Sequence, residues 1–120
     1  MCRCLIAFLP IFLTGCVAPS TYQWGAYERD LYTAYKDPTQ YETFRLKLEA
    51  LTTEVESRRE KVAPGIYAEL GTLYLQKGDA NTAIALYKKE RDTWPESKGL
   101  MTAMIQNLEK RENSKQEPQK

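Results

Sequence analysis

Residues 64–95, PGIYAELGTLYLQKGDANTAIALYKKERDTWP, decide the fold of this 120-residue chain. A Pro-Gly pair interrupts any earlier helix, and a helical pattern of apolar residues follows it until Gly78. Glycine readily adopts the left-handed conformation that closes a helix, and Asp79 is a good cap for the next one. The second pattern ends before Pro95, which cannot continue a helix. The stretch therefore predicts two helices joined by a short turn.

Seven residues of this stretch fall at the offsets of one tetratricopeptide repeat, which is a pair of antiparallel helices. They are Tyr67, Leu70, Gly71, Tyr74, Ala83, Tyr87 and Pro95. Gly71 and Ala83 are small, as two closely crossing helices require, and the larger residues fill the space around the crossing. Glu90 departs from the repeat, which usually has a small residue there, so we expect a looser contact with the following helix.

The resemblance to the repeat also implies a concave side on the first of these helices. That side would present Ala68, Thr72, Leu75 and Gln76. Repeats that clamp a peptide carboxylate use Lys and Asn on this side, so recognition of a chain terminus is not expected. Leu75 is kept as a candidate for a shallower contact with a protein partner.

Helical patterns continue on both sides of the repeat. The expected helices cover residues 24–36, residues 38–61 (the longest, with Asp37 as its cap) and residues 97–110. Their apolar faces are Trp24, Tyr27, Leu31 and Tyr35; then Tyr41, Phe44, Leu48, Leu51 and Val55; and finally Leu100, Met101, Met104, Ile105 and Leu108. The sequence thus predicts an all-α domain at residues 24–110, with about five helices arranged as tetratricopeptide-like antiparallel helical hairpins. Residues 111–120 contain no apolar residue and are expected to form a disordered tail.

The first sixteen residues, MCRCLIAFLPIFLTGC, are typical of a secretory signal. The uncharged run is too short for a membrane-spanning helix, which needs about 20 apolar residues. The sequence LTGC at residues 13–16 resembles a bacterial lipobox, so we expect residues 1–15 to be removed and Cys16 to be lipidated. Residues 16–23 would then be a lipidated tether. Val17 stands where lipoproteins retained in the inner membrane typically have Asp, and this favours the periplasmic face of the outer membrane.

The amino-acid composition argues against several classes of function. The chain has no histidine, which argues against most kinds of enzyme and metal site. Its formal net charge is +1, so it lacks the excess of basic residues that nucleic-acid binding needs. No cofactor motif is present, and Ser57 and Ser97 have no histidine partner for nucleophilic catalysis. A cell-wall hydrolase would need paired carboxylates. The candidates, Glu28, Asp30, Glu54 and Glu56, alternate with arginines as a solvated surface does.

Two kinds of binding surface stay open. A peptide or glycan platform would use Tyr22, Trp24 and Tyr32, although Trp24, Tyr27 and Tyr35 are expected to share a buried stripe, which leaves Tyr22 and Tyr32 as the exposed candidates. A protein-contact surface would use Leu100 and Met104, which either complete the core or meet a partner.

Three segments carry a resemblance to a known family: the lipobox, TYQWGAYERDLY at residues 21–32, and PGIYAELGTLYLQKGD with WPES between residues 64 and 97. Together they resemble a family of small uncharacterised bacterial lipoproteins that contain a domain of unknown function. The resemblance implies a gene neighbourhood with a lipoprotein related to the curli secretion channel and a second small lipoprotein. We therefore expect a non-catalytic accessory or scaffold in an envelope or secretion-related complex, anchored by lipid, with other envelope lipoproteins as partners. The alternative is a periplasmic binding module for peptidoglycan or polysaccharide.

Overall fold

The protein is described by a computed structural model that covers residues 21–116, and this range is all-helical with no strand. Its five α-helices are α1 (Tyr27–Lys36), α2 (Tyr41–Ser57), α3 (Ile66–Gln76), α4 (Ala80–Thr93) and α5 (Lys98–Gln116). Two short 3₁₀ turns, η1 (Pro38–Gln40) and η2 (Pro95–Ser97), precede α2 and α5. The prediction of an all-α chain with about five helices is confirmed within this range. The expected signal, the lipidation site Cys16 and residues 117–120 lie outside the described residues.

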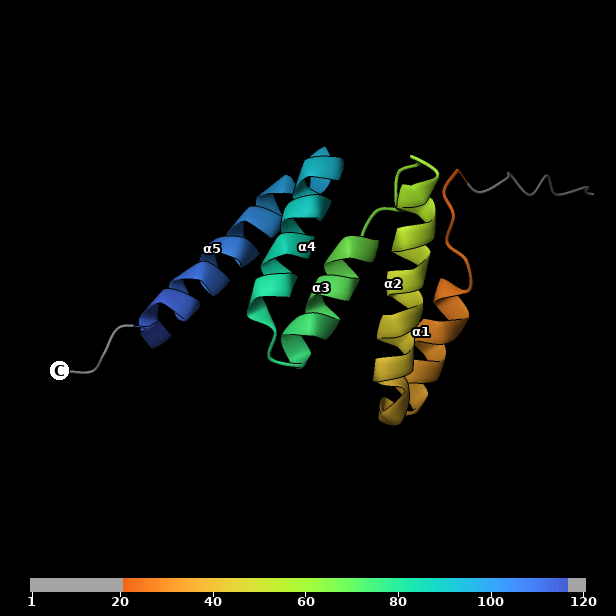
Figure 1. The fold of residues 1–120 in the computed structure, drawn as a ribbon, viewed down its shortest axis with the longest axis horizontal. Helices are drawn as coiled ribbons and strands as arrows, with labels where there is room; N and C mark the ends of the chain where they lie inside the picture. The colour runs from red at the N-terminus through yellow and green to blue at the C-terminus, as the bar shows by residue number, and fades with distance from the viewer. Residues whose placement is uncertain (1–20, 117–120) are drawn as a thin grey trace, which may run out of the picture.

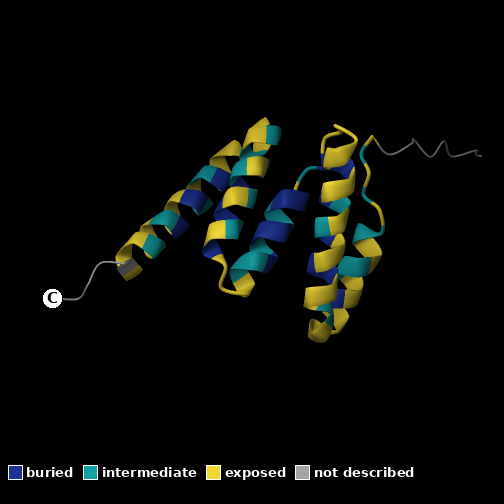
Figure 2. Cartoon of the chain, viewed as in Figure 1, coloured by how far each residue is buried: buried dark blue, intermediate teal, exposed yellow. Residues whose placement is uncertain are grey.

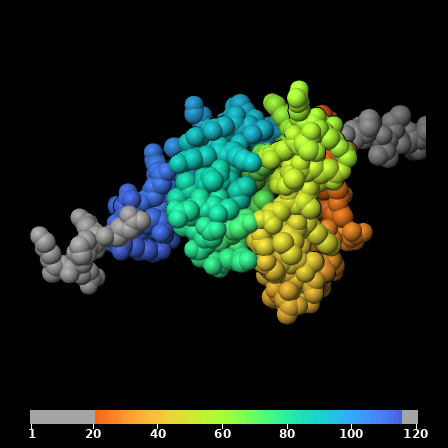
Figure 3. Space-filling model, in the orientation of Figure 1, coloured from red at the N-terminus to blue at the C-terminus, as the bar shows by residue number. Residues whose placement is uncertain are grey.

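The helices stand in a row in chain order, with each helix packed on the next (Figure 1). The closest association is between α3 and α4, followed by α4 with α5 and then α2 with α3. Buried residues lie on the faces that neighbouring helices share, and the outer faces are exposed (Figure 2). In the space-filling view, side chains close the spaces between the ribbons of α2, α3 and α4 (Figure 3). Within the described range, none of the helices is both long and apolar enough to cross a membrane.

Local capping explains where most of the helices begin and end. The Thr39 amide donates to Asp37 Oδ1 at 3.0 Å, so Asp37 caps η1 directly before α2. Gly78 has a φ of 85° after α3, and the Thr82 amide donates to Asp79 Oδ1 at 3.0 Å at the start of α4. The predicted caps at these positions are confirmed. They were predictable because each involves residues only a few positions apart.

Three helix lengths differ from the expectation. The helix α1 begins at Tyr27, and not at Trp24. The helix α2 ends at Ser57, and not near Lys61, because Arg59 adopts a left-handed φ of 59° and the Glu60 amide donates to the Val55 carbonyl at 3.2 Å. This is the hydrogen-bond pattern that closes a helix.

At the other end of the chain, α5 continues to Gln116, six residues beyond the boundary expected at 110, and is the longest helix of the described range. None of residues 111–115 is buried, but these residues extend a helix that has already formed, and extension is far easier than nucleation. Lys115 also pairs with Glu112 at 2.7 Å. The expectation of a disordered tail from residue 111 is therefore wrong for residues 111–116.

The buried side chains form two clusters. The first, on α1, α2, α3 and the loop before α3, consists of Ala34, Phe44, Leu48, Val55, Val62, Ala63, Ile66, Tyr67, Leu70 and Leu73. The second, on α4 and α5, consists of Ala83, Ile84, Tyr87, Met101, Ile105 and Leu108. Tyr74 of α3 packs against both clusters. The core is therefore continuous from α1 to α5, and α3 is the element that joins its two parts.

The expected apolar stripe of α1 is wrong at one position. Ala34 is fully buried, whereas Tyr35 is 76% exposed. Tyr27, Leu31 and Ala34 form the inner face, at spacings of four and three residues. The helix α1 stands at the end of the row and α2 covers it from one side only, so its buried face is narrow and Tyr35 falls outside it (Figure 1).

Candidate functional site

The helices α3 and α4 approach each other closely at Gly71 of α3. A Cβ atom at this position would lie 2.7 Å from Cε1 of Tyr87 and 3.3 Å from the carbonyl oxygen of Ala83, both on α4. The hydroxyl of Tyr87 reaches back across the contact and lies 3.1 Å from Thr72 Oγ1. The structure thus brings Gly71, Ala83 and Tyr87 together, with Tyr67 and Leu70 buried on the same helix as Gly71.

Tyr74 has a polar role that the sequence pattern did not reveal. Its hydroxyl accepts a hydrogen bond from Arg45 Nη1 at 2.9 Å and donates one to Glu49. Arg45 is buried on α2, where Glu42 binds it in bidentate fashion at 2.6 and 3.1 Å and Glu49 lies 2.7 Å away. Lys77, directly after α3, completes the group, with its Nζ 3.1 Å from the Glu42 carboxylate. We call these five residues the Arg45 cluster, and it links α2 to α3.

The Arg45 cluster is balanced in charge. Hydrogen bonds from Arg45, and then from Lys77, lower the pKa of Glu42 to about 2. The buried guanidinium already has carboxylate partners in the bidentate geometry that arginine favours. It therefore stabilises the contact between α2 and α3 and offers no free charge to a ligand.

A second polar group joins α2, α3 and α4. The hydroxyl of Tyr67 donates to Glu56 Oε1 at 2.6 Å, and Lys89 Nζ donates to the same oxygen at 2.7 Å. The hydrogen bonds from Lys89 and then Tyr67 lower the pKa of Glu56, whereas burial raises the pKa of Tyr67. Tyr67 is thus a core residue whose hydroxyl also forms a hydrogen bond between α3 and α2.

Glu90 is buried at 1% exposure, and the expectation of a looser contact there is wrong. Its Oε1 accepts hydrogen bonds from the Gly65 amide at 2.8 Å and from Ser97 Oγ at 3.1 Å. The carboxylate therefore ties the start of α3 to η2 through α4, since an acceptor suits the free amides at a helix N-terminus. Two buried atoms nearby, Glu90 Oε2 and Trp94 Nε1, have no hydrogen-bond partner among the described residues.

The N-terminal segment forms the wall of an open hollow of about 750 Å³. The hollow is lined by residues 21–25 together with Glu60 and Lys61. Tyr22 is half-buried, and its ring meets the ring of Trp94 edge-on at 5.2 Å, while Lys61 Nζ lies 5.4 Å from the centre of the Trp94 ring. The expectation that Tyr22 is exposed and belongs to a tether is therefore wrong, because its ring packs on Trp94, directly after α4.

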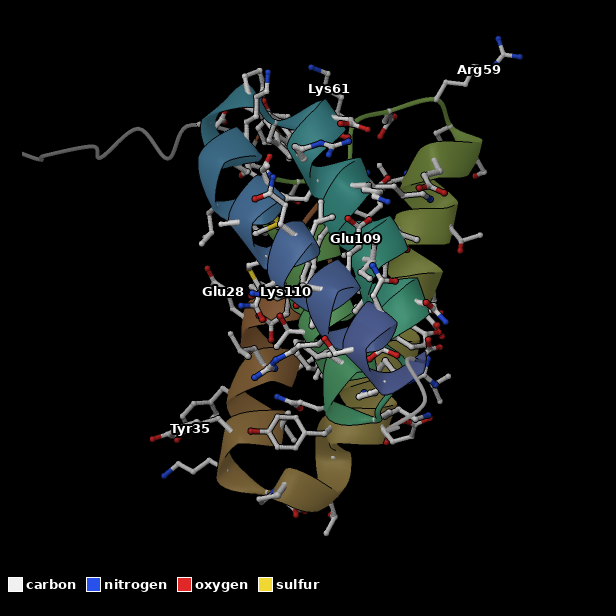
Figure 4. The ribbon with its side chains drawn as sticks, turned by 90° about the vertical axis from the view of Figure 1, so that its left-hand side faces the viewer. Glu28, Tyr35, Arg59, Lys61, Glu109 and Lys110 are labelled. Atoms are coloured by element: carbon white, nitrogen blue, oxygen red, sulfur yellow. The ribbon has the colours of Figure 1, made fainter. Side chains whose placement is uncertain are left out.

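Tyr32 and Tyr35 are the most exposed large aromatic residues of the described range, at 61% and 76%. Both lie on α1, three positions apart, and Lys36 Nζ lies 5.6 Å from the centre of the Tyr32 ring. Tyr35 points away from the body of the protein, at the end opposite to Lys61 (Figure 4). The structure thus keeps Tyr32 as an exposed candidate and adds Tyr35, which the sequence pattern assigned to the core.

The three apolar candidates for partner contact separate into two kinds. Leu75 of α3 and Met104 of α5 are half-buried and pack against the second cluster. Leu100 is 65% exposed at the start of α5. The neighbouring Met101 takes the buried position. Only Leu100 of the three is freely accessible.

The carboxylates considered for catalysis do not form a pair. Asp30 bonds Lys47 at 2.8 Å, Glu54 bonds Arg58, and Glu56 bonds Lys89 and Tyr67. Glu28 is exposed on α1. The part of the chain that the structure describes contains no group of three or more His, Cys, Asp or Glu side chains placed to hold a metal ion.

A sequence model described as a domain of unknown function (DUF4810) matches residues 21–104. The match begins at the N-terminal segment that carries Tyr22 and ends within α5, so it spans α1 to α4 and the first part of α5. No curated protein and no solved structure matches the chain.

Proposed function

The chain belongs to the DUF4810 family, and we propose that it is a lipoprotein on the periplasmic face of the outer membrane, acting as a non-catalytic accessory or scaffold in an envelope or secretion-related complex. The lipid anchor is supported by the lipobox-like LTGC at residues 13–16, which follows an uncharged run and a lone basic residue. Two or three acyl chains give lasting attachment where a single chain is only marginal. Val17 supports sorting to the outer membrane.

We assign the body a tetratricopeptide-like arrangement. Three features support it: the Gly71 approach to Tyr87, the extensive contact between α3 and α4, and the apolar face of α5 that covers α4. In such arrays each helix pair buries its apolar face against its neighbour, and the last helix closes the stack. The array then presents outer surfaces for contact with other proteins.

The observation that carries the scaffold role is the exposure of Tyr32 and Tyr35 on α1. Tyrosines with this degree of exposure are enriched at protein interfaces, since each supplies a large contact area with little loss of conformational freedom. The carboxylates Asp30, Glu54 and Glu56, by contrast, are occupied by basic partners. These observations therefore favour a role in protein contact through aromatic side chains over a catalytic role.

A pull-down from detergent-solubilised membranes tests this role. We expect the wild-type chain to retain envelope lipoproteins and the double variant Tyr32→Ser, Tyr35→Ser to lose most of them, with its circular dichroism unchanged because both residues are exposed. Leu46→Ser is the matched control, since Leu46 is another exposed apolar residue, at 52%, on a different helix. Equal recovery of partners by the double variant and the wild type would exclude this surface as the docking site.

The alternative role, binding of peptidoglycan or polysaccharide, is favoured by the hollow at residues 21–25, where Tyr22 and Trp24 stand beside Glu60 and Lys61. Aromatic rings with nearby polar groups are a common setting for sugars. Sedimentation with purified sacculi separates the two roles. A glycan binder would sediment with sacculi in the absence of other proteins, and a scaffold would not.

A further inference from the structure

We propose that the end of the protein formed by the N-terminal segment and the loop before α3 faces the phosphate groups of a phospholipid bilayer. This inference rests on the lipid anchor proposed at Cys16, and it adds the orientation of the body and the contact that the body makes. We call this end the anchor-side end and define it by residues 21–25, residues 58–65 and Trp94.

Packing fixes the start of the described chain to the anchor-side end. The ring of Tyr22 meets that of Trp94 at 5.2 Å, and residues 21–25 share one hollow with Glu60 and Lys61. The point at which the chain leaves toward Cys16 therefore lies beside the loop before α3, and not beside the turns at the opposite end (Figure 1).

The length of chain between the anchor and the body limits how far this end can stand from the membrane. Cys16 lies five positions before Thr21. Five residues span at most about 18 Å even when fully extended. A lipid on Cys16 would therefore hold the anchor-side end near the headgroups and leave Tyr35 and the turn between α3 and α4 on the far side (Figure 4).

The charge of the anchor-side end suits anionic headgroups. Residues 58–65 contain three cations and one carboxylate. Within the described residues, Arg58 pairs with Glu54, but Arg59 and Lys61 make no ion pair, and both project from the same end of the protein (Figure 4). The turns at the opposite end, residues 36–40 and 77–79, each contain one cation and one carboxylate. Arginine and lysine side chains near a bilayer surface are attracted to anionic lipid over roughly one Debye length, about 8 Å at physiological ionic strength.

Arg59 occupies a position at which glycine would be favoured. Its φ of 59° lies in the left-handed region, and the amides of Arg59 and Glu60 donate to the carbonyls of Glu56 and Val55 in the pattern that closes α2. The substitution Arg59→Gly consequently removes the charge without harm to the loop backbone. It provides a variant in which a loss of lipid contact cannot be ascribed to unfolding.

Amide NMR on lipid bilayers tests the orientation. The chain from Cys16 onward contains every described residue and a single thiol, so a maleimide lipid couples it to nanodiscs at one site, whether or not a cell lipidates it. With a gadolinium-bearing headgroup in anionic phosphatidylglycerol bilayers, we expect the amides of Glu60 and Lys61 to lose at least half of their intensity. The amides of Gly78 and Asp79 should keep nearly all of theirs. Equal broadening at the two ends would overturn the orientation.

The phosphate contact has its own test. The variant Arg59→Gly, Lys61→Gln should reduce the broadening at Glu60 at least twofold on anionic bilayers. Lys36→Gln, which removes one unpaired cation at the opposite end, should leave it unchanged. A double variant as broadened as the wild type would overturn the contact. Mass spectrometry of Cys16 from cells tests the lipid anchor separately, so failure of the anchor and failure of the orientation give different results.

Discussion

At Gly71 the backbone of α3 lies directly against the ring of Tyr87, with no room for a side chain. We expect Gly71→Ala to destabilise the protein by about 1–3 kcal/mol, because the new Cβ would lie 2.7 Å from the Tyr87 ring and the fully buried ring has little room to move. Urea unfolding followed by circular dichroism measures the change. Gly99→Ala is the matched control: Gly99 is also helical, but a Cβ there meets no atom within 4 Å, so we expect no loss or a gain of up to about 1 kcal/mol. Similar midpoints for the two variants would contradict the close approach at Gly71.

Among the helices, α2 and α3 are held together by charge as well as by apolar packing. Glu42 has a folded-state pKa of about 2, below its ordinary 4.5, because it accepts hydrogen bonds from Arg45 and Lys77. A lowered pKa contributes stability above pH 4.5, and this contribution is lost as the pH falls from about 4.5 through about 2. We therefore expect Glu42→Gln to be less stable than the wild type at neutral pH, and the two to converge near pH 2.

Thermal unfolding across this pH range measures the effect of Glu42. Glu96→Gln is the matched control, since Glu96 is an exposed carboxylate with no hydrogen bond or ion pair to the described residues. A constant difference between Glu42→Gln and the wild type at every pH would show that the Arg45 cluster does not depend on the ionised Glu42.

At the scale of the whole molecule, the proposed attachment to the membrane depends on one atom, the sulfur of Cys16. We expect Cys16→Ser to move the protein from the outer-membrane fraction to the soluble periplasmic fraction. The cations of the anchor-side end alone are too few for lasting attachment, which takes acyl chains. Cell fractionation with labelled fatty acid measures both location and acylation. A variant that still sediments with the outer membrane, beside a wild type that takes up no label, would refute the lipoprotein proposal.

The sequence by itself determined the helical class and most of the helix ends. Asp37, Gly78, Asp79 and Pro95 mark boundaries that the structure has within a residue or two, because capping and chain reversal depend on neighbours in the sequence. The small size required at Gly71 was also predictable, since the spacing of apolar residues on both sides of the turn identifies the helix crossing.

Only the tertiary structure decided which polar residues are buried and which aromatic residues are exposed. Arg45 and Glu90 look like surface residues in the sequence, and they are buried where each has a hydrogen-bond partner 25 or more positions away, Tyr74 for Arg45 and the Gly65 amide for Glu90. Tyr35 fits an apolar stripe and is exposed, because α1 has a neighbour on one side only, and Tyr22 packs on Trp94 from the opposite half of the chain. These outcomes depend on contacts between distant segments, and a local pattern of residues contains no information about which distant segment will lie alongside.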